Sequence, residues 1–557
     1  MSSRRSGRRV VWARRVVQGV FLALFLILLL DVRKGGDRSP GELHQLFFDL
    51  DPLVLVGTWM ASHAVPVALL FSLGVLAFTV VLGRVFCGWV CPLGTVHAMG
   101  SWFRTGHLKK LIETETWTRW QRGKYYFLVM LLVMAALGTS WIGFLDPFSF
   151  LYRSTTTAIL PAAQEVLEDG STTIYHADPH LGPLHLTSVT EPVYKSYRDR
   201  FMVVQNWAFT GSGLIFLLFL VAVLLNLFRK RFWCRYLCPL GALLGLFAKR
   251  PLFRLSTDSE ACIDCGLCRT NCQGAAAPDR PGHQLPSECF VCWNCVPQCK
   301  AQGLAFKFHS PFKSQSIGKL SLSRRALLGA GLAGVGGVLL SRISPQAQGR
   351  VYNPNLIRPP GASAEKDFLK KCIACGLCMK VCPTNGLQPT LTEAGLDGLW
   401  TPHLIPKIGY CEYECNVCGQ VCPTGAIEPL TLEEKKKTKI GLATIDTSRC
   451  LPYAYQRECS ICEEHCPVPD KAIYFVPAEV SLRDGSRATL RQPRVDADRC
   501  TGCGICEAKC IFNDLPAIRV TSAGETRHPK NQPMLATAPL SAGGTAQGEE
   551  ISGSDYY

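Results

Sequence analysis

The spacing of twenty-eight cysteines constrains this chain more than any other feature. Twenty-four of them fall into six groups of four, and the remaining four form two Cys-x-x-x-Cys-Pro motifs. In a short secreted chain so many cysteines would indicate disulfides, but regular groups of four in 557 residues are typical of metal-binding modules. We therefore expect several small modules, each folded around its own metal groups.

The first two groups have the C-x2-C-x2-C-x3-C spacing of a bacterial two-cluster ferredoxin. Their members are Cys262, Cys265, Cys268, Cys272, Cys289, Cys292, Cys295 and Cys299. Because the fourth cysteine of each run binds the other cluster in that arrangement, two [4Fe-4S] clusters are expected here. The predicted ligand sets are Cys262, Cys265, Cys268 and Cys299 for one cluster, and Cys289, Cys292, Cys295 and Cys272 for the other. Zinc is the alternative, but it favours two separated pairs of ligands.

Four further runs follow in the second half of the chain. They are Cys372, Cys375, Cys378 and Cys382; Cys411, Cys415, Cys418 and Cys422; Cys450, Cys459, Cys462 and Cys466; and Cys500, Cys503, Cys506 and Cys510. Sixteen cysteines predict four more [4Fe-4S] clusters, which makes six in all. The runs can pair in tandem or nested; because the outer two runs are the regular ones, we favour nested pairing, first with fourth and second with third.

The first 255 residues contain four apolar spans, at about 16–30, 65–82, 125–144 and 213–228. Each approaches the roughly 20 residues that cross a bilayer. Basic residues at the N-terminus, in the 83–124 loop and at 229–231 predict that these segments face the cytoplasm. We therefore expect a helical transmembrane domain of two repeated two-helix halves.

Each half ends in one Cys-x-x-x-Cys-Pro motif, which contributes Cys87 and Cys91 in the first half and Cys234 and Cys238 in the second. Cysteines at i and i+4 share one face of a helix. If the halves face each other, the four thiols converge on a seventh redox centre. A redox-active thiol pair in each half and buried structural cysteines are the alternatives, and the sequence does not separate them.

Residues for a quinol site are harder to assign. Asp51 and Asp146 stand at equivalent Asp-Pro corners of the two halves, where they could accept protons or simply cap helices. His176, His180 and His185 lie in one of the loops predicted outside, and solvated histidines are the plainer interpretation. No catalytic residue follows from this.

The sequence Ser323-Arg324-Arg325-Ala326-Leu327-Leu328, followed by an apolar run to Leu340, is typical of a twin-arginine export signal. The alternative is a positive flank that holds one end of a membrane helix in the cytoplasm. Export of folded protein suits the four runs that follow, since bare thiols would form disulfides in an oxidising periplasm. No clear cleavage site precedes Arg350, so we expect the segment to stay as a fifth membrane helix.

These features predict a multi-domain membrane protein with α+β ferredoxin-like domains on both sides of the membrane. The expected parts are a transmembrane domain (1–255), a cytoplasmic two-cluster domain (256–312), the signal segment (313–350), a periplasmic four-cluster domain (351–520) and a disordered tail (521–557). The net charge of +16 lies largely beside apolar spans and forms no aromatic-interleaved patch, so nucleic acid is not an expected partner.

In their order, the motifs resemble two families. Residues 1 to about 310 are similar to the NapH and MauN membrane ferredoxin-type proteins, and residues from about 320 to 520 resemble the NapG and MauM proteins with their twin-arginine signal. The resemblance implies a fusion of the two in the bacterial cytoplasmic membrane. It implies a quinol dehydrogenase component that takes electrons from the quinone pool and passes them to a periplasmic oxidoreductase or cytochrome. The alternative is a redox maturation factor that supplies electrons for cofactor assembly in a periplasmic enzyme.

Overall fold

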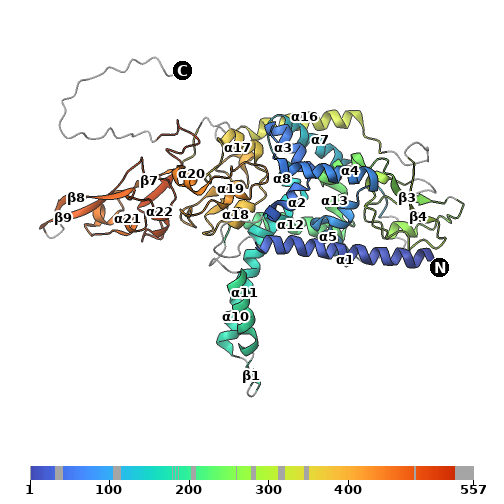
Figure 1. Cartoon of the computed structure of the whole chain (residues 1–557), viewed down its shortest axis with the longest axis horizontal. Helices are drawn as coiled ribbons and strands as arrows, with labels where there is room; N and C mark the ends of the chain where they lie inside the picture. Colours follow the sequence, from blue (N-terminus) through green and yellow to red (C-terminus); the bar gives the residue numbers. More distant parts are fainter. Residues whose placement is uncertain are drawn as a thin grey trace, which may run out of the picture.

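A body of helices separates two regions built from short strands, one at each end of an elongated molecule (Figure 1). The structure is a computed structural model. It describes residues 2–31, 42–104, 115–178, 180–181, 184–185, 187–201, 208–258, 260–277, 284–310, 320–343, 351–481 and 485–532.

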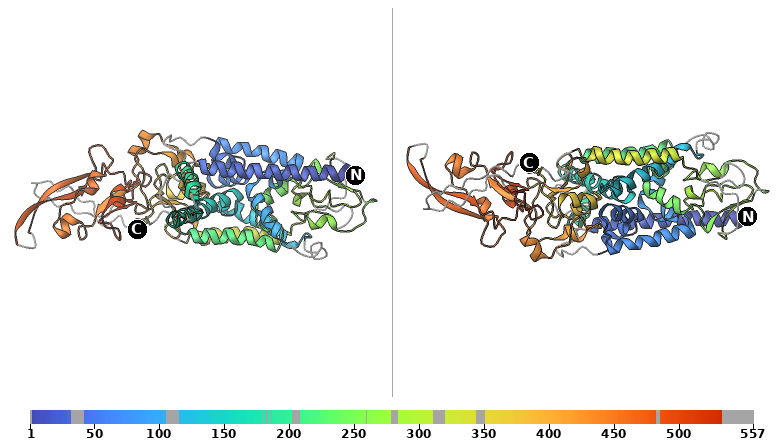
Figure 2. Two further views of the ribbon diagram at one scale, coloured as in Figure 1. Left: turned by 90° about the horizontal axis from the view of Figure 1, so that it is seen from below. Right: turned by 90° about the horizontal axis from the view of Figure 1, so that it is seen from above.

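The central body consists mainly of helices that run along the long axis, with α1 on one side and α16 on another (Figures 1 and 2). Its helices are α1 (Ser2–Asp31), α2 (Leu46–Asp49), α3 (Pro52–Ser62), α4 (Ser72–Leu82), α5 (Pro92–Gly100), α7 (Gly123–Ala136), α8 (Ile142–Leu145), α9 (Pro147–Ser154), α12 (Ser212–Leu224), α13 (Phe232–Tyr236), α14 (Pro239–Phe247) and α16 (Arg324–Ser341). An arm made of α10 (Leu160–Ala177), β1 (His180–Leu181), β2 (Leu184–His185) and α11 (Thr187–Phe201) projects away from the body (Figure 1).

The two sequence repeats form equivalent local structures. Asp51 caps α3 by accepting a hydrogen bond from the Leu53 amide at 2.7 Å, and Asp146 caps α9 by accepting one from the Ser149 amide at 2.7 Å. Each aspartate is followed by proline at the first helical position, where the missing N–H costs nothing. The helices α5 and α14 begin in the same way, directly after the second cysteine of each Cys-x-x-x-Cys-Pro motif.

The prediction of a multi-span membrane domain is wrong. Among the described residues, one helix is long and apolar enough to cross a bilayer, Arg5–Leu30 within α1. The apolar helices Pro52–Ser62, Val67–Leu82 and Ser212–Leu227 are shorter, and at 1.5 Å per residue the longer two reach only about 24 Å of a hydrocarbon core of about 30 Å. The expected third span is interrupted, because α7 ends before Gly138, whose φ is +83°.

Apolar side chains nevertheless lie exposed on several helices of the body. Examples are Phe78 on α4, Leu217 on α12 and Leu332 on α16. Apolar surface of this extent marks a contact with another protein or with lipid. The opposite face of α16, which contains Ala330, Gly334 and Val338, is buried, and at Gly334 it packs against α7.

Each end of the molecule is built from two-stranded antiparallel sheets and short helices. At the end near the N-terminus lie β3 (Phe253–Thr257), paired with β4 (Leu304–Phe308), and α15 (Leu267–Thr270). At the other end lie α17 (Glu365–Lys371), α18 (Leu377–Val381), β5 (Leu387–Pro389), β6 (Pro402–Leu404), α19 (Val417–Gln420), α20 (Leu432–Lys437), β7 (Leu442–Ile445), α21 (Ile461–Glu464), β8 (Ile473–Ser481), β9 (Arg487–Val495), α22 (Ile505–Lys509) and β10 (Ile518–Thr521). There β5 pairs with β6, β8 with β9, and β7 with β10.

The C-terminal segment differs in part from the expected disordered tail. Residues up to 532 fold onto the second end: Asn531 donates a hydrogen bond to the Ser522 carbonyl at 2.9 Å, and Arg527 forms an ion pair with Glu365 at 2.8 Å. The rest of the expected tail, residues 533–557, lies outside the described residues.

Candidate iron–sulfur centres

The loops that carry three of the six cysteine runs share one backbone conformation. In three of the runs a glycine follows the second cysteine, with φ values of +67° at Gly266, +87° at Gly376 and +82° at Gly504. A short helix starts directly after each glycine and contains the third cysteine of the run. Left-handed backbone is the conformation that glycine adopts without strain, so the glycines turn the chain and bring three thiols of a run to one side.

The structure brings together the ligand sets expected at the first end. Cys262, Cys265, Cys268 and Cys299 line a single small cavity. Cys272 interacts electrostatically with Cys289, Cys292 and Cys295 of the other run as well as with Cys268 of its own. The fourth cysteine of each run thus lies with the other run, as in a two-cluster ferredoxin.

At the second end the runs pair in tandem, so the nested pairing is wrong. Cys382 lines a cavity with the first three cysteines of the second run, and Cys422 interacts with Cys372 and Cys375. In the same way Cys510 lies near Cys450, and Cys466 lies near Cys500 and Cys503. The resulting sets are 372/375/378/422, 382/411/415/418, 450/459/462/510 and 466/500/503/506.

The elements between the runs explain the tandem order. The β5–β6 hairpin lies between the first and second runs, and the long β8–β9 hairpin lies between the third and fourth. The β7–β10 pair then closes the third and fourth runs into one module. Each pair of neighbouring runs is therefore a local unit, whereas nested pairing would require the first run to reach across the whole domain.

The cysteines of the six runs fit [4Fe-4S] clusters. None of the cysteines is in a disulfide. The four thiolates that bind a [4Fe-4S] cube lie further apart than the four ligands of a single metal ion. The described residues contain no group of three or more Cys, His, Asp or Glu residues close enough to bind a single metal ion. Fourth cysteines also accept backbone N–H bonds: Ala276 donates to Cys272 at 3.2 Å, and Ala472 donates to Cys466 at 3.4 Å. Such bonds tune cluster potentials.

Burial shapes the chemistry of these thiols. It raises the pKa of Cys372 to about 12, that of Cys411 to about 12 and that of Cys462 to about 12. A buried thiol of this kind stays protonated at neutral pH unless a metal charge stabilises the thiolate. Cluster assembly must therefore release these protons, and the folded site is suited to hold iron rather than free thiolates.

The four cysteines of the Cys-x-x-x-Cys-Pro motifs also converge. Cys87, Cys91, Cys234 and Cys238 are all buried, and Cys238 interacts electrostatically with the other three. The amide of Gly241 donates a hydrogen bond to the Cys238 sulfur at 3.2 Å, as at the ferredoxin runs. Four convergent buried thiols are a donor set of the kind that holds an iron–sulfur cluster.

Two buried arginines flank this quartet. The Arg84 guanidinium lies 3.9 Å from the Cys87 sulfur, and Arg231 donates a hydrogen bond to the Cys87 carbonyl at 2.9 Å. Both side chains are fully buried, and both lie over the Phe290 ring. Fixed cations beside four thiols favour an anionic centre in this position.

The quartet packs directly on the second ferredoxin run. The Trp89 indole donates a hydrogen bond to the Val291 carbonyl at 3.0 Å, and a Cβ at Gly88 would overlap the Phe290 carbonyl oxygen. Glu288 connects the two regions, because its carboxylate pairs with Lys124 and with Arg84, the latter at 3.5 Å. No side chain or solvent layer separates the Gly88 backbone from the Cys289–Cys292 loop.

The two repeated aspartates meet inside the helical body. Their buried carboxyl groups interact electrostatically, and burial raises the pKa of both Asp51 and Asp146. Two carboxylates in one buried site do not both ionise readily, so the pair is expected to share a proton at neutral pH. The capping interpretation is confirmed, because both carboxylates accept backbone N–H bonds at the start of a helix, and the proton-acceptor role stays a prediction. The histidines lie elsewhere: His176 is in α10, and His185 pairs with Asp178 at 3.1 Å in the projecting arm.

The first run of the second end docks on the helical body through Arg153. This buried guanidinium donates to the Ala374 carbonyl at 2.8 Å and lies 4.6 Å from the centre of the Trp400 ring. Gly143 also approaches the Ile373 carbonyl so closely that a Cβ would overlap it. The loop Cys372–Cys375 is thus fixed against α8 and α9.

Sequence reasoning assigned Arg84 and Arg231 to cytoplasmic flanks and did not connect them with the cysteines. A signal was present: each arginine stands three residues before the first cysteine of its motif, giving Arg-x-x-Cys-x-x-x-Cys-Pro twice. Arg153 carried no such signal, since its partner in the cysteine region, the Ala374 carbonyl, lies 221 residues away in sequence.

The fold and these sites define an iron–sulfur protein of the ferredoxin type that transfers electrons. The 4Fe-4S binding domain family matches residues 64–110 and 211–256, which contain the quartet, and another 4Fe-4S binding domain family matches residues 368–388.

Comparison with individual proteins identifies the family. The chain is 36% identical over 205 residues to the methylamine utilization ferredoxin-type protein MauM of Methylorubrum extorquens, which covers 36% of this chain and 89% of the relative. It is 35% identical over 214 residues to MauM of Paracoccus denitrificans (37% and 91%) and 36% identical over 165 residues to the ferredoxin-type protein NapG of Escherichia coli (29% and 69%). The chain belongs to the MauM/NapG family of ferredoxin-type proteins. No solved structure matches it.

Proposed function

We propose that this chain takes electrons from quinol and delivers them to a redox partner outside the cytoplasmic membrane. The observation that carries the proposal is the arrangement of donor sets at both ends of one helical body, with the quartet packed against one of them. When bound, [4Fe-4S] clusters supply one-electron transfer. Six sets of four cysteines are proposed to hold six clusters, at the positions given above.

The quartet Cys87/Cys91/Cys234/Cys238 is proposed to hold a further iron–sulfur centre. Its burial, its two flanking arginines and the matching 4Fe-4S binding domain family support this assignment. Iron analysis and Mössbauer spectra of the C91A/C238A double variant test it. We expect the loss of one centre, with the signals of the six ferredoxin sets unchanged; an unchanged iron content would contradict it.

Membrane attachment is proposed through α1. This helix has an apolar stretch preceded by arginines and runs along the long axis of the molecule (Figure 1). If α1 crosses the bilayer, the two iron–sulfur ends lie on opposite sides of it. The twin-arginine sequence at the start of α16 supports an outer location for residues 351–532.

The Asp51–Asp146 pair is the proposed proton acceptor for quinol oxidation, since it is the buried acidic pair between the two ends. Neutral side chains beside it, such as Phe148, would keep water away from a shared proton.

Reduction of the purified full chain by a menaquinol or ubiquinol analogue, followed by low-temperature EPR, tests the function. EPR signals of reduced clusters after addition of quinol would support quinol oxidation. The rate at which these signals appear should be at least tenfold lower in D51N/D146N. If dithionite reduced the clusters but quinol did not, quinol oxidation would be contradicted, and supply of electrons for cofactor assembly in a partner would be the better account.

A further inference from the structure

A large basic cavity lies at the first end of the molecule, outside all the cysteine sets. Its volume is about 660 Å³, within the range of small-ligand sites. It is lined by the basic part of α1, by residues 101, 102 and 104 after α5, by Lys230, and by loops of the two-run ferredoxin region. Four parts of the chain that are far apart in sequence therefore enclose it.

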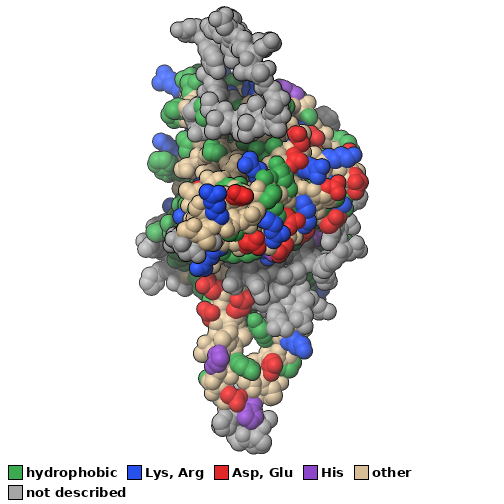
Figure 3. All heavy atoms as spheres, turned by 90° about the vertical axis from the view of Figure 1, so that its left-hand side faces the viewer, with side chains coloured by type: hydrophobic (Ala, Val, Ile, Leu, Met, Phe, Trp, Pro, Cys, Tyr) green, Lys and Arg blue, Asp and Glu red, His purple; other side chains and the backbone are tan. Residues whose placement is uncertain are grey.

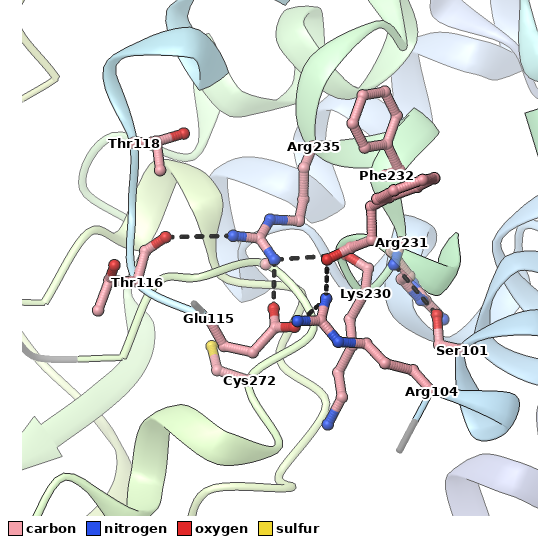
Figure 4. Close-up of polar contacts among 12 residues, drawn as sticks. Ser101, Arg104, Glu115, Thr116, Thr118, Lys230, Arg231, Phe232, Arg235 and Cys272 are labelled. Atoms are coloured by element: carbon pink, nitrogen blue, oxygen red, sulfur yellow. Dashed lines mark hydrogen bonds and ion pairs between the residues drawn. The ribbon is translucent and has the colours of Figure 1, made fainter. Parts of the chain in front are cut away.

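The lining carries positive charge without matching negative charge. Arg8, Arg14, Arg15, Arg104 and Lys230 line the cavity, and no aspartate or glutamate lines it among the residues that the structure describes. Arg104 forms an ion pair with Glu115, which does not line the cavity. Figure 4 shows the guanidinium groups of Arg104 and Arg235 on either side of Glu115, with Lys230 beside them.

Arg14 gives the second, independent indication of a ligand. Its side chain is only 2% exposed, and its two terminal nitrogens donate to amide oxygens, of Gln273 at 3.0 Å and of Asn294 at 3.3 Å. Its Nε is buried and has no hydrogen-bond partner among the described residues. Cys292, a predicted cluster ligand, interacts electrostatically with Arg14 from the ferredoxin side. A buried guanidinium is costly unless an anion accepts its remaining donor.

Two tryptophans complete the site. Trp12 on α1 and Trp102 after α5 both line the cavity and are 69% and 65% exposed. Tryptophan is enriched at the level of lipid headgroups, and arginine binds phosphate oxygens through paired N–H donors. Lys230, held by the Thr270 carbonyl and Asn271, adds a point charge.

We infer that this cavity binds a phosphate-bearing anion, either the phosphodiester headgroup of an anionic lipid or a soluble phosphate. The arginines of α1 recognise the phosphate oxygens, and the tryptophans flank the group that carries the phosphate. This inference does not depend on the proposed quinol oxidation.

The test compares two double variants of the cluster-loaded full chain. R8Q/R15Q removes two exposed arginines that line the cavity, and R5Q/R9Q removes two exposed arginines of the same helix that do not line it. Both lower the net charge equally. Arg14 is left in place because it packs against the ferredoxin loops, and visible absorbance of the clusters checks that each variant is folded.

Binding is measured by calorimetry and native mass spectrometry with three probes: phosphatidylglycerol in mixed micelles, phosphatidylcholine as its uncharged control, and inorganic phosphate. We expect R8Q/R15Q to weaken binding of phosphatidylglycerol or phosphate by at least about tenfold, since charge-assisted hydrogen bonds to the phosphate oxygens are lost, and R5Q/R9Q to change it less than about twofold. Binding of the lipid without competition by phosphate identifies a headgroup site, and tight binding of phosphate itself identifies a soluble ligand. Equal weakening in both variants, or no binding of either anion by the unaltered chain, would overturn the inference.

Discussion

At the residue scale, buried charges decide where the iron–sulfur regions are held. Four charged side chains are nearly or fully buried, and each has a partner from a distant part of the chain. They are Arg84, Arg153, Arg231 and Glu365. Removing one member of a buried pair leaves the other charge uncompensated, which costs about 3–5 kcal/mol. These residues are therefore better targets than the many exposed ion pairs.

Glu365 gives a pH-dependent prediction. Burial alone would raise the pKa of Glu365, but the guanidinium groups of Arg358 and Arg527 outweigh it and lower the pKa to about 2. A lowered pKa contributes stability that is present above the ordinary pKa of about 4.5 and is lost as the pH falls toward 2. We expect E365Q to be less stable by on the order of 3 kcal/mol at pH 7.

Denaturant-induced loss of the visible cluster absorbance measures this effect. The difference in the free energy of unfolding between E365Q and the unaltered chain should be constant from pH 8 to about pH 5. It should become smaller below pH 4.5. The exposed Glu433→Gln is the control, because it pairs loosely with Lys436 on the surface. A difference that did not change with pH would show that packing, and not ionisation, explains the loss.

Arg231 gives a prediction for the proposed quartet centre. Replacing this buried cation by glutamine should make an anionic centre harder to reduce, by on the order of 60–120 mV if about 1.4–3 kcal/mol of stabilisation is lost. Potentiometric EPR measures the shift, and Lys249→Gln, an exposed cation of the same region, should leave the potential unchanged. Equal potentials in all three proteins would argue against a reducible centre at the quartet.

At the scale of elements, each pair of neighbouring cysteine runs forms one module. Tandem pairing follows from local hairpins, which close at a smaller entropic cost than contacts across the whole domain. The spacing of the cysteines within each run does not depend on which other run shares its clusters. The sequence therefore could not distinguish tandem from nested pairing.

Iron content distinguishes the two pairings. Cys372 and Cys422 belong to one set in the structure, so C372A/C422A should lose the iron of a single cluster, about four atoms per chain. Cys372 and Cys510 belong to different sets, so C372A/C510A should lose about eight. Nested pairing predicts the reverse order of losses, and the two variants serve as controls for each other.

Docking of the second end on the helical body should depend on Arg153. Arg153→Met removes the hydrogen bond to the Ala374 carbonyl and the contact with the Trp400 ring, at an expected cost of about 2–4 kcal/mol. Hydrogen exchange should rise in α8, α9 and residues 372–378. Arg449→Met removes an exposed pair with Asp514 and should cost less than about 1 kcal/mol. Unchanged exchange in Arg153→Met would mean that other contacts hold the interface.

Much of this element level could be predicted from the sequence, and some could not. Cysteine spacing predicted the two-run ferredoxin sets because the cluster dictates both the ligands and their order. Apolar runs predicted helices near residues 16–30, 65–82, 125–144 and 213–228, but hydropathy does not show where a helix ends, and Gly138 ends α7 within the third run. The buried arginines were missed because a charge beside an apolar run looks the same in sequence whether it faces solvent or a thiol.

At the scale of the whole molecule, two iron–sulfur ends are joined by one elongated body (Figures 1 and 2). The face at the β8–β9 end carries acidic and basic side chains side by side (Figure 3). Ion pairs of this end of the molecule include Arg499–Asp496 and Arg519–Asp446, whose arginines are exposed. A redox partner that docks on this face would meet mixed charge rather than a field of one sign, so its association should depend only moderately on salt.

The proposed outer location of that end depends on the twin-arginine sequence. Arg324 and Arg325 open α16 and are exposed, whereas the packed face of this helix is formed by residues such as Gly334 and Val338. Replacing both arginines by lysine therefore keeps the charge and should leave the packing of α16 on α7 intact. Export signals of this type are recognised through the paired arginines, so R324K/R325K should leave residues 351–532 in the cytoplasm.

Protease treatment of spheroplasts measures this location. The protease should degrade residues 351–532 in the unaltered protein and spare them in R324K/R325K, while R8K/R9K, a matched change on α1, should behave like the unaltered protein. Degradation in all three proteins would show that the segment crosses by another route, and protection in all three would place both iron–sulfur ends on the cytoplasmic side.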